Sequence, residues 1–573
     1  MRKRILLSTM GMLWLFQSFS VLGQATMLEG YTILQHSQSL DSTGRFTFIP
    51  GVNLLTQMGA SAQSNEKGRF QLLNSSGVNK GTRVVLQAKK EGYALVHPQS
   101  LSRIKLGQQL PIYVSMLPTT TFEQEQSKLQ ALIKQYQEQH YQEWHKRLQQ
   151  SDDATDVLLE LSLAFQQELT QKDTAVQLLR SLQVTQQAEL TRHSTFLVSL
   201  NRDLVSGACR SALLALQKGA IETALRELES EDAMETIFAL QEKLLASYTA
   251  SDSPAIRKEI WEAQLYQQLL SLEVLASLYS LKYDFAKALT TYQLIFETLL
   301  DELLKDYPAA LAVLAHKERL YQSLGLPDKL LGTQLMAKEV AERAYPEFDE
   351  ALIPYYTAVA KSYEQRQQLE KAISYRRQAL EIMENTVPFS VERLVGSYQK
   401  IATSYEQLGV TEKALKYTKS ALQLAELAMP NARDTMGTLH TQAALFHVDL
   451  GQTNAALTQV GKAMACLSTD SPTYATAKTL RDQLCPQLPD HPTCLSTVAV
   501  ASATPTLKSP TLGTYQVTQK TSLRAASTHK SKVLKRLQVG TAVQVLEHTN
   551  QYWWKVEYQG QIGWVKNFLL EEG

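Results

Sequence analysis

Cysteine and excess charge of either sign are both scarce in this sequence. Only four cysteines occur among 573 residues, which excludes a small scaffold held together mainly by disulfides. The 57 Lys and Arg residues almost balance the 56 Asp and Glu residues, so the net charge is +1. A nearly neutral chain has no overall electrostatic reason to bind nucleic acid or anionic lipid. We therefore expect no nucleic-acid partner.

Sequence signatures of catalysis are also missing. The chain has no P-loop, no G-x-G-x-x-G, no H-E-x-x-H and no G-x-S-x-G. Cys209 lies within a helical pattern, which is typical of a buried core residue and not of a nucleophile. His140 and His145 are too far apart on a helix to share a face, and His447 occupies the aromatic position of a repeat, described below. We expect no enzyme, no metal site and no cofactor.

Long apolar runs are confined to the start of the chain. Basic residues 2–4 (Arg-Lys-Arg) precede an uncharged, mostly apolar stretch at 5–23. Gly23 and Ala25 then have the spacing that a signal peptidase recognises. This pattern predicts a signal peptide at 1–25, with an uncleaved anchor helix as the alternative.

The predicted export signal sets the expected location. No cysteine lies near the cleavage point, the nearest being Cys209, so we expect no lipoprotein. No later stretch is apolar enough to cross a membrane, so we expect no transmembrane span in the mature chain. The prediction is an exported protein, periplasmic or secreted.

The segment 26–118 is divided by Gly, Pro, Asn and Ser into short apolar or alternating runs. Such runs predict the strands of a small β-sandwich. Gly68 suits a tight turn, after which Phe70 and Leu72 are expected to point to one face.

Three short motifs in this segment carry a family resemblance. They are Pro50, the Lys-Gly-Arg-Phe turn at 67–70 and Gly-Tyr at 92–93. With them the segment resembles the carboxypeptidase regulatory-like domain, a transthyretin-like β-sandwich. That domain is non-catalytic, so the resemblance implies a structural or adhesive module.

The middle of the chain is helical in pattern. Residues 121–251 show amphipathic periodicity, and a helix, a Gly-containing turn and a second helix at 212–225 suggest a degenerate repeat. From 255 to 484 the pattern recurs every 42 residues, with an aromatic column at Tyr279, Tyr321, Tyr363, Tyr405 and His447. Mostly small residues stand three positions before it, nine after it and sixteen after it: Ala276, Glu318, Ala360, Ala402 and Ala444; Ala288, Leu330, Ala372, Ala414 and Ala456; Ile295, Ala337, Ala379, Ala421 and Ala463.

Small residues at these spacings let two antiparallel helices approach closely, and recurring units predict an α-solenoid of about five repeats. The columns resemble the tetratricopeptide repeat (TPR), in the longer form found in kinesin light chains. Ser471 and Pro472 begin a further helix, which we interpret as the terminal capping helix.

The resemblance to TPR arrays also implies a binding surface, because their first helices line the inner face. The polar candidates on that face are Arg319, Gln322, Thr357, Lys361, Glu364, Gln399, Thr403 and Glu406. These side chains could pair with an extended or helical peptide, although an ordinary solvated face has the same pattern.

The segment 485–513 has the composition of a linker. Cys485 and Cys494 lie close together within it and, in an exported protein, are candidates for a short-loop disulfide. Two free thiols, or pairing of one of them with Cys466, remain the alternatives.

The segment 514–573 returns to strand patterns. Its motifs are Leu-Arg at 523–524, Val-Leu-Lys-Arg-Leu at 533–537, Tyr-Trp-Trp-Lys-Val at 552–556 and Gly-Trp-Val at 563–565. The segment resembles a bacterial SH3 domain, a small barrel of which many members bind cell-wall peptides or proteins. Trp553, Trp554 and Trp564 are the candidate surface contacts.

The sequence as a whole predicts a mainly α, multi-domain protein, with a TPR solenoid flanked by an N-terminal β-sandwich and an SH3-like β-barrel. We expect a non-enzymatic exported adaptor that binds a protein or peptide in the cell envelope. One alternative is a cell-wall protein that binds peptidoglycan through the SH3 domain. Another is the extracytoplasmic sensory part of a signalling system.

Overall fold

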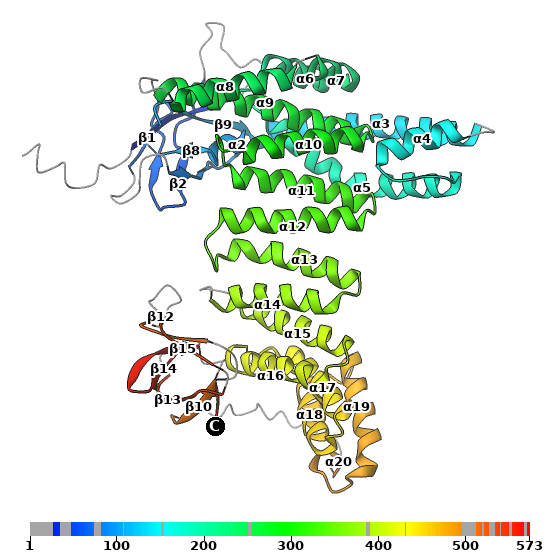
Figure 1. Ribbon diagram of the computed structural model, residues 1–573, viewed down its shortest axis with the longest axis vertical. Coiled ribbons are helices and arrows are strands. Elements are labelled where there is room, and N and C mark those ends of the chain that lie inside the picture. Colours follow the sequence, from blue (N-terminus) through cyan, green and yellow to red (C-terminus); the bar gives the residue numbers. More distant parts are fainter. Residues whose placement is uncertain are drawn as a thin grey trace, which may run out of the picture. The chain divides into compact units, whose positions relative to one another are not determined.

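Figure 1 shows the computed structural model of the chain. It describes residues 27–34, 47–73, 82–106, 108–150, 154–202, 204–230, 232–249, 255–385, 390–429, 431–495, 512–517, 521–526, 533–538, 540–548, 553–566 and 570–572. The predicted signal peptide at 1–25 lies outside these ranges. The chain divides into two compact units, Met1–Leu326 and Pro327–Gly573.

The first unit begins with a β region. One sheet has the strand order β4 (Arg69–Leu73), β1 (Met27–Leu34), β9 (Ile112–Pro118) and β7 (Tyr93–Val96). A second has the order β3 (Ser61–Gln63), β2 (Asn53–Thr56) and β6 (Leu86–Lys89), and β5 (Arg83–Val84) pairs with β8 (Ile104–Lys105). Strand β1 runs parallel to β9 and antiparallel to β4. The predicted turn is present, because Gly68 has φ of +67° and both Phe70 and Leu72 are buried in one core.

Nine helices follow among the described residues of this unit, after the short α2 (Pro98–Leu101). They are α3 (Thr119–Gln150), α4 (Thr155–Phe165), α5 (Lys172–Val198), α6 (Gly207–Gln217), α7 (Ile221–Glu229), α8 (Ala233–Thr249), α9 (Ala255–Leu281), α10 (Phe285–Leu300) and α11 (Tyr307–Ser323). Helix α5 packs against α3 and also contacts α9 and α11. The predicted hairpin at 212–225 is present as α6 and α7, joined at Gly219 with φ of +76°.

The second unit consists of further helices and a C-terminal β-sheet (Figure 1). Its helices are α12 (Pro327–Ala344), α13 (Ile353–Gln365), α14 (Leu369–Asn385), α15 (Val391–Gln407), α16 (Thr411–Ala428), α17 (Arg433–Asp449), α18 (Thr453–Cys466) and α19 (Pro472–Leu484), with a 3-10 turn at Glu350–Leu352. Successive helices pack as antiparallel neighbours, and α19 packs on α17 and α18. Ser471 is the N-cap of α19 and accepts a hydrogen bond from the backbone N–H of Thr473 at 3.3 Å.

The 42-residue columns are the buried seams of these hairpins. In the small-residue columns, every alanine is at most 3% exposed, whereas Glu318 and Leu330 in the second repeat are half-buried. The aromatic column is buried at Tyr279, Tyr363, Tyr405 and His447. The solenoid predicted from the period is therefore confirmed in its packing.

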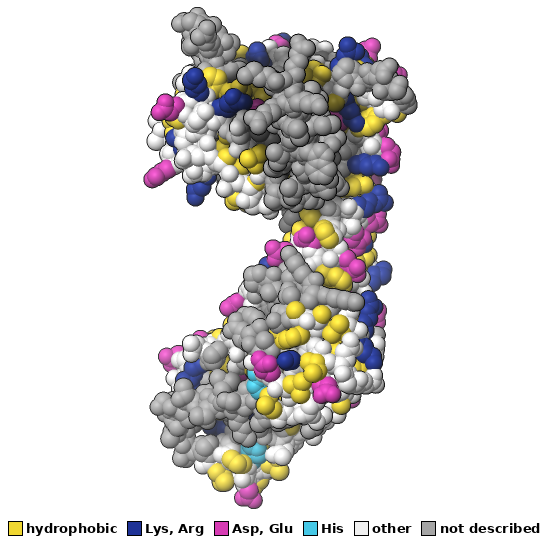
Figure 2. All heavy atoms as spheres, turned by 90° about the vertical axis from the view of Figure 1, so that its left-hand side faces the viewer, with side chains coloured by type: hydrophobic (Ala, Val, Ile, Leu, Met, Phe, Trp, Pro, Cys, Tyr) yellow, Lys and Arg dark blue, Asp and Glu magenta, His cyan; other side chains and the backbone are white. Residues whose placement is uncertain are grey.

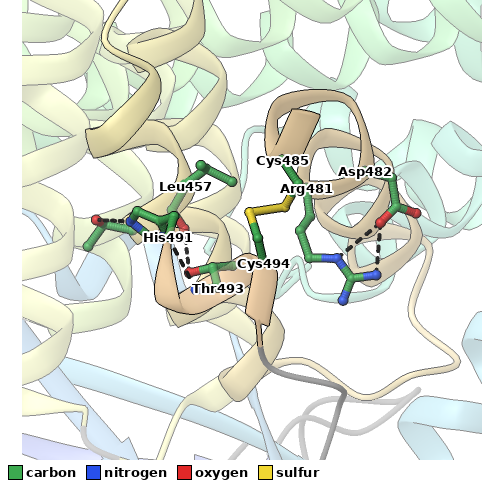
Figure 3. Close-up of a disulfide and its surroundings, with 8 residues drawn as sticks. Leu457, Arg481, Asp482, Cys485, His491, Thr493 and Cys494 are labelled. Carbon is green, nitrogen blue, oxygen red and sulfur yellow. Dashed lines mark hydrogen bonds and ion pairs between the residues drawn. A yellow bond between two sulfur atoms is a disulfide. The ribbon is translucent and has the colours of Figure 1, made fainter. Parts of the chain in front are cut away.

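The predicted linker begins later than expected. Residues Cys485–Gln487 form a 3-10 turn and Pro492–Leu495 form the short helix α20, which contacts α18 and α19. Cys485 and Cys494 are joined by a disulfide, and the Thr493 hydroxyl donates to the Leu457 carbonyl at 3.1 Å (Figure 3). Cys466 is a free cysteine. Packing therefore extends to Leu495, and residues 496–511 of the predicted linker lie outside the described residues.

The C-terminal segment forms a single sheet of seven strands. The strands are β10 (Thr514–Val517), β11 (Thr521–Arg524), β12 (Val533–Leu537), β13 (Ala542–Glu547), β14 (Trp553–Tyr558), β15 (Gln561–Lys566) and β16 (Leu570–Glu572), in the order β12-β11-β15-β14-β13-β10-β16. Its core includes Tyr515, Leu523, Val545, Trp554 and Val565.

Candidate functional site

The predicted inner-face residues of the second unit lie on two helices, each of which is the first helix of its hairpin. Thr357, Lys361 and Glu364 lie on α13, and Gln399, Thr403 and Glu406 lie at the same spacing on α15. Lys361, Thr403 and Glu406 are exposed, whereas Thr357, Gln399 and Glu364 are half-buried. We call these six residues the inner face.

Glu364 is engaged inside the solenoid. Its carboxylate forms an ion pair with Arg376 of α14 and accepts a hydrogen bond from the Ser404 hydroxyl of α15 at 3.1 Å. Glu364 therefore links three consecutive helices, and its carboxylate has less capacity to accept hydrogen bonds from a partner protein.

Glu406 has a different environment. Burial raises the pKa of its carboxyl, and the negative charge of Asp449 on α17 raises it further. Two neighbouring carboxylates that repel one another favour a cation nearby. The inner face thus offers a positive side chain, Lys361, on α13 and a negative one, Glu406, on α15, whose charge interacts with that of Asp449 on α17.

Arg319 and Gln322 belong to the first unit, on α11. The Arg319 guanidinium lies 3.7 Å from the Glu189 carboxylate of α5 and bonds the His316 ring at 2.8 Å. Helix α5 therefore engages Arg319 within the unit, whereas Gln322 is exposed. The sequence did not predict this contact, because the amphipathic pattern of α5 does not indicate which helix it packs against.

The three tryptophans do not form an exposed surface together. Trp553 and Trp554 are only 3% and 4% exposed. Trp554 packs edge-on against Tyr515 in the barrel core, with ring centroids 5.2 Å apart. Trp564 is half-buried, with the Lys555 ammonium 5.7 Å from its ring centroid. Trp553 and Trp554 are consecutive on β14 and therefore point to opposite faces of the sheet: Trp554 enters the barrel core, and Trp553 faces the helices of the repeat across a cleft described below. Of the three rings, Trp564 keeps the most surface for a ligand.

The SH3 segment packs against the second helices of the repeat. The Gln423 amide on α16 donates to the Leu570 carbonyl at 2.6 Å, and the Arg524 guanidinium donates to the Asn385 amide oxygen of α14 at 3.4 Å. Lys566 of β15 lies close enough to Glu384 of α14 for the charge of each to favour the charged form of the other.

A cleft of about 830 Å³ lies at this junction. Helices α14 and α16 line one side, and strands β11, β12, β14 and β15 line the other. We call it the junction cleft. Its charged lining residues are Arg377, Lys413, Lys416, Arg524, Arg536 and Lys566, with Glu347, Glu381 and Glu384. None of the six inner-face residues lines it, so the two surfaces are separate.

Sequence reasoning missed this cleft and the contacts that bound it. Arg377, Lys413 and Lys416 are spaced like an ordinary solvated helix surface, and no local pattern shows that a barrel lies over them. The recurrence of Lys287, Lys371 and Lys413 in step with the repeat does not reveal the cleft either. Each ammonium lies over the tyrosine of its own repeat, 5.2, 5.2 and 5.4 Å from the rings of Tyr279, Tyr363 and Tyr405.

Charge on the visible surface is mixed. On the face that Figure 2 shows, basic and acidic side chains are interspersed and do not gather into one large region of a single sign. This agrees with the net charge of +1. Recognition by this protein therefore depends on local groups.

The described part of the chain contains neither a metal-binding cluster nor a membrane-spanning helix. Within it, no cluster of three or more His, Cys, Asp or Glu side chains has the arrangement to hold a metal ion. Nor does any described helix combine the length and apolarity needed to cross a membrane.

Residues 520–571 match the bacterial SH3 domain family. No curated protein matches the chain. Among solved structures, BtubC (BKLC) from P. vanneervenii is 17% identical and has a TM-score of 0.27, covering 44% of this chain and 92% of its own. A kinesin light chain with TPR-like repeats from Podosopora anserina is 15% identical, with a TM-score of 0.27, over 35% of this chain and 94% of its own. Aspartyl phosphate phosphatase F from Bacillus subtilis is 14% identical, with a TM-score of 0.25, over 54% of this chain and 85% of its own.

The chain is thus a body of TPR-like helical repeats with an N-terminal β region and a C-terminal bacterial SH3 domain. Repeats and SH3 domains of these kinds are typically non-catalytic binding modules. Together they suggest a protein-interaction scaffold.

Proposed function

We propose that this protein is an exported, non-enzymatic adaptor of the cell envelope. In this proposal the inner face binds a segment of a partner protein, and the SH3 domain docks to the cell wall or to a second protein. The N-terminal β region serves as a structural or adhesive module of the carboxypeptidase regulatory-like type.

One observation carries the proposal for the inner face. The SH3 domain contacts α14 and α16, the second helices of their hairpins, and leaves Lys361, Thr403 and Glu406 exposed on the first helices. Polar side chains at regular helical spacing on adjacent helices can pair with successive groups of an extended or helical peptide. The positive Lys361 and the negative Glu406 would set the direction in which that peptide lies.

Site-specific photo-crosslinking in the native host tests this assignment. A photoreactive residue at 361 or 403 is expected to trap one partner, and the same residue at Glu370 of α14 or Lys419 of α16 is expected not to. With the photoreactive residue at 403, Lys361→Glu combined with Gln399→Ala should then reduce the trapped fraction at least tenfold. Equal trapping at all four positions, or an unchanged yield in the double variant, would refute the inner-face assignment.

The bacterial SH3 match favours a second role, binding to peptidoglycan. The barrel segment carries eight basic residues, Lys520, Arg524, Lys530, Lys532, Lys535, Arg536, Lys555 and Lys566, against four acidic ones, Glu547, Glu557, Glu571 and Glu572. Such an excess of positive charge suits an acidic polymer. Trp564, the accessible tryptophan, is the side chain that we expect to touch a wall fragment.

Co-sedimentation with purified sacculi tests the wall-binding role. The mature protein is expected to pellet, and a form without residues 514–573 is expected to stay in solution. Trp564→Ala in the full chain should weaken pelleting without disturbing the barrel core. If the full protein stays in solution, the wall-binding role fails and the SH3 domain is left with a protein partner.

A further inference from the structure

The junction cleft is separate from the inner face. Arg524, Arg536 and Lys566 of its lining are among the eight basic residues counted for wall binding, but no contact proposed above lies inside the cleft. Its volume of about 830 Å³ lies within the range of about 300–1,000 Å³ that is typical of ligand-binding sites. It is built by two different domains of the second unit. A ligand held there would contact the repeat and the SH3 domain at once.

Positive charge dominates the lining of the junction cleft. Arg377, Lys413 and Lys416 come from the helices, and Arg524, Arg536 and Lys566 come from the barrel. Three glutamates oppose these six cations, which leaves a net charge of +3 in a chain whose overall charge is +1. The excess is therefore local.

One of the three glutamates already has partners. Glu384 accepts a hydrogen bond from the Tyr398 hydroxyl, and its charge interacts with that of Lys566 and, more weakly, with that of Arg377. Setting aside this pair of opposite charges, five cations remain against Glu347 and Glu381, so the net charge of +3 is unchanged. This local excess of positive charge attracts anionic ligands.

The cations of the barrel side also oppose one another. Burial lowers the pKa of the Lys566 ammonium; the negative charge of Glu384 opposes this change, and the positive charge of Arg524 adds to it. Burial lowers the pKa of Arg524 as well. Holding these charges together costs free energy in the empty cleft, and a bound carboxylate would offset that cost. Arg377 and Arg536 are exposed, so their guanidinium groups are accessible for two-point contacts with carboxylates.

The junction cleft also has apolar lining. Val533 and Phe348 are large hydrophobic side chains left 41% and 36% exposed, and the Trp553 ring lines the cleft beside them. An inorganic anion or a sugar polymer would leave this apolar surface uncovered. A peptide that carries both acidic and apolar side chains matches both parts of the lining.

We propose that the junction cleft binds a short acidic peptide segment of a partner protein, with its carboxylates on Arg377 and Arg536 and an apolar side chain against Val533. This site goes beyond the proposed inner-face function. It would make the SH3–repeat junction a second point of capture on the same scaffold.

Fluorescence anisotropy with the full mature chain tests the proposal. The probe is a fluorescein-labelled pool of heptapeptides made from Asp, Glu, Leu and Phe, and the reference is the same pool with Lys in place of Asp and Glu. We expect saturable binding of the acidic pool alone, weakened by added salt. Inorganic polyphosphate should compete poorly, because it lacks apolar groups.

Charge reversal locates the binding. Arg377→Glu with Arg536→Glu is expected to weaken binding at least tenfold, and Val533→Ser is expected to weaken it severalfold. The matched control reverses Arg393 and Lys400, two exposed cations of α15 that do not line the cleft, and should leave affinity within twofold. Absence of saturable binding by the acidic pool, equal losses in the cleft and control variants, or stronger binding of polyphosphate would each overturn the proposal.

Discussion

At the scale of single residues, Asp306 connects the β region to the helices of the first unit. It is 3% exposed and is the N-cap of α11, accepting a hydrogen bond from the Ala309 backbone N–H at 3.3 Å. Its carboxylate also lies 2.8 Å from the Arg83 guanidinium and accepts from the Tyr266 hydroxyl at 2.7 Å. One side chain therefore serves a helix end, a strand and a neighbouring helix.

We expect Asp306→Ala to destabilise the first unit by about 3–5 kcal/mol, because it leaves the Arg83 and Arg103 cations without their carboxylate. Urea unfolding read by hydrogen exchange of peptides from β5 and β8 measures the loss. Asp284→Ala is the control. That residue caps α10 in the same way but lacks a strand partner, so its loss should be about 1 kcal/mol. Equal losses would contradict the role given to the ion pairs.

At the scale of elements, every repeat hairpin closes its first helix in the same way. The backbone N–H of the fifth residue after the aromatic position donates to the aromatic residue's carbonyl, at 2.8–2.9 Å in all five repeats. The residue before that donor has a positive φ, which favours glycine. Gly325, Gly409 and Gly451 meet this requirement, whereas Tyr283 and Gln367 adopt the same conformation with side chains.

This difference predicts opposite effects at two equivalent turns. Gly409→Gln should lower the stability of the second unit by about 1 kcal/mol, because its φ of +72° suits a side chain poorly. Gln367→Gly should raise stability by about 0.5 kcal/mol, since its φ of +58° relaxes without a side chain. Thermal unfolding of the paired variants measures both changes. Effects of the same sign would contradict the turn argument.

The elements also show which parts of the binding surface were predictable. The first-helix positions Lys361 and Thr403 are exposed, as a polar column on an amphipathic helix should be. The engagement of Glu364 by Arg376 and Ser404 was not predictable, because it depends on which helices become neighbours. The burial of Trp553 was not predictable from the Tyr-Trp-Trp-Lys-Val motif either, because it depends on how the SH3 domain packs against the helices.

At the scale of the whole molecule, the three histidines whose pKa burial lowers most lie in the first unit. Burial lowers the pKa of His97 and His193 to about 4 and that of His316 to about 3, against an ordinary value of 6.5. The folded unit therefore favours the neutral rings. In the same unit, burial raises the pKa of Glu273 to about 7 from 4.5, which favours its neutral form.

These shifts predict acid sensitivity of the first unit. Between pH 4.5 and 6.5 the unfolded chain binds up to three more histidine protons, while the folded chain retains one on Glu273. Stability is therefore present above pH 6.5 and is lost as the pH falls toward 4, by about 2 kcal/mol per pH unit in the steepest part. Above pH 6.5 the slope falls toward zero, because the unfolded histidines and the folded Glu273 lose their protons over the same pH range.

Urea unfolding at pH 5.0, 5.5, 6.0 and 6.5, followed by hydrogen exchange of peptides from α9 to α11, measures this dependence. A variant with His97, His193 and His316 changed to Gln should show a flat or reversed profile. His491→Gln in the second unit serves as the control and should leave the profile unchanged. A triple variant that keeps the original slope would show that other groups cause the acid sensitivity.

The sequence by itself determined the features that recur or act locally. The 42-residue columns, the turn at Gly68, the cap at Ser471 and the strand motifs of the SH3 domain depend on neighbours within a few residues or on a regular period. The order of the domains follows from them. Such features can be recognised in the sequence because helices and strands place residues on one face at a regular spacing.

Only the tertiary structure decided which surfaces stay accessible. It brought α5 against Arg319, joined Arg83 to Asp306, and placed the SH3 barrel over α14 and α16 to form the junction cleft. Each of these contacts joins segments far apart in sequence, where loop closure and packing select one partner among many. The sequence pattern of a polar position on a helix is the same whether solvent, a neighbouring helix or a ligand will contact it. Its role is therefore set when the elements pack.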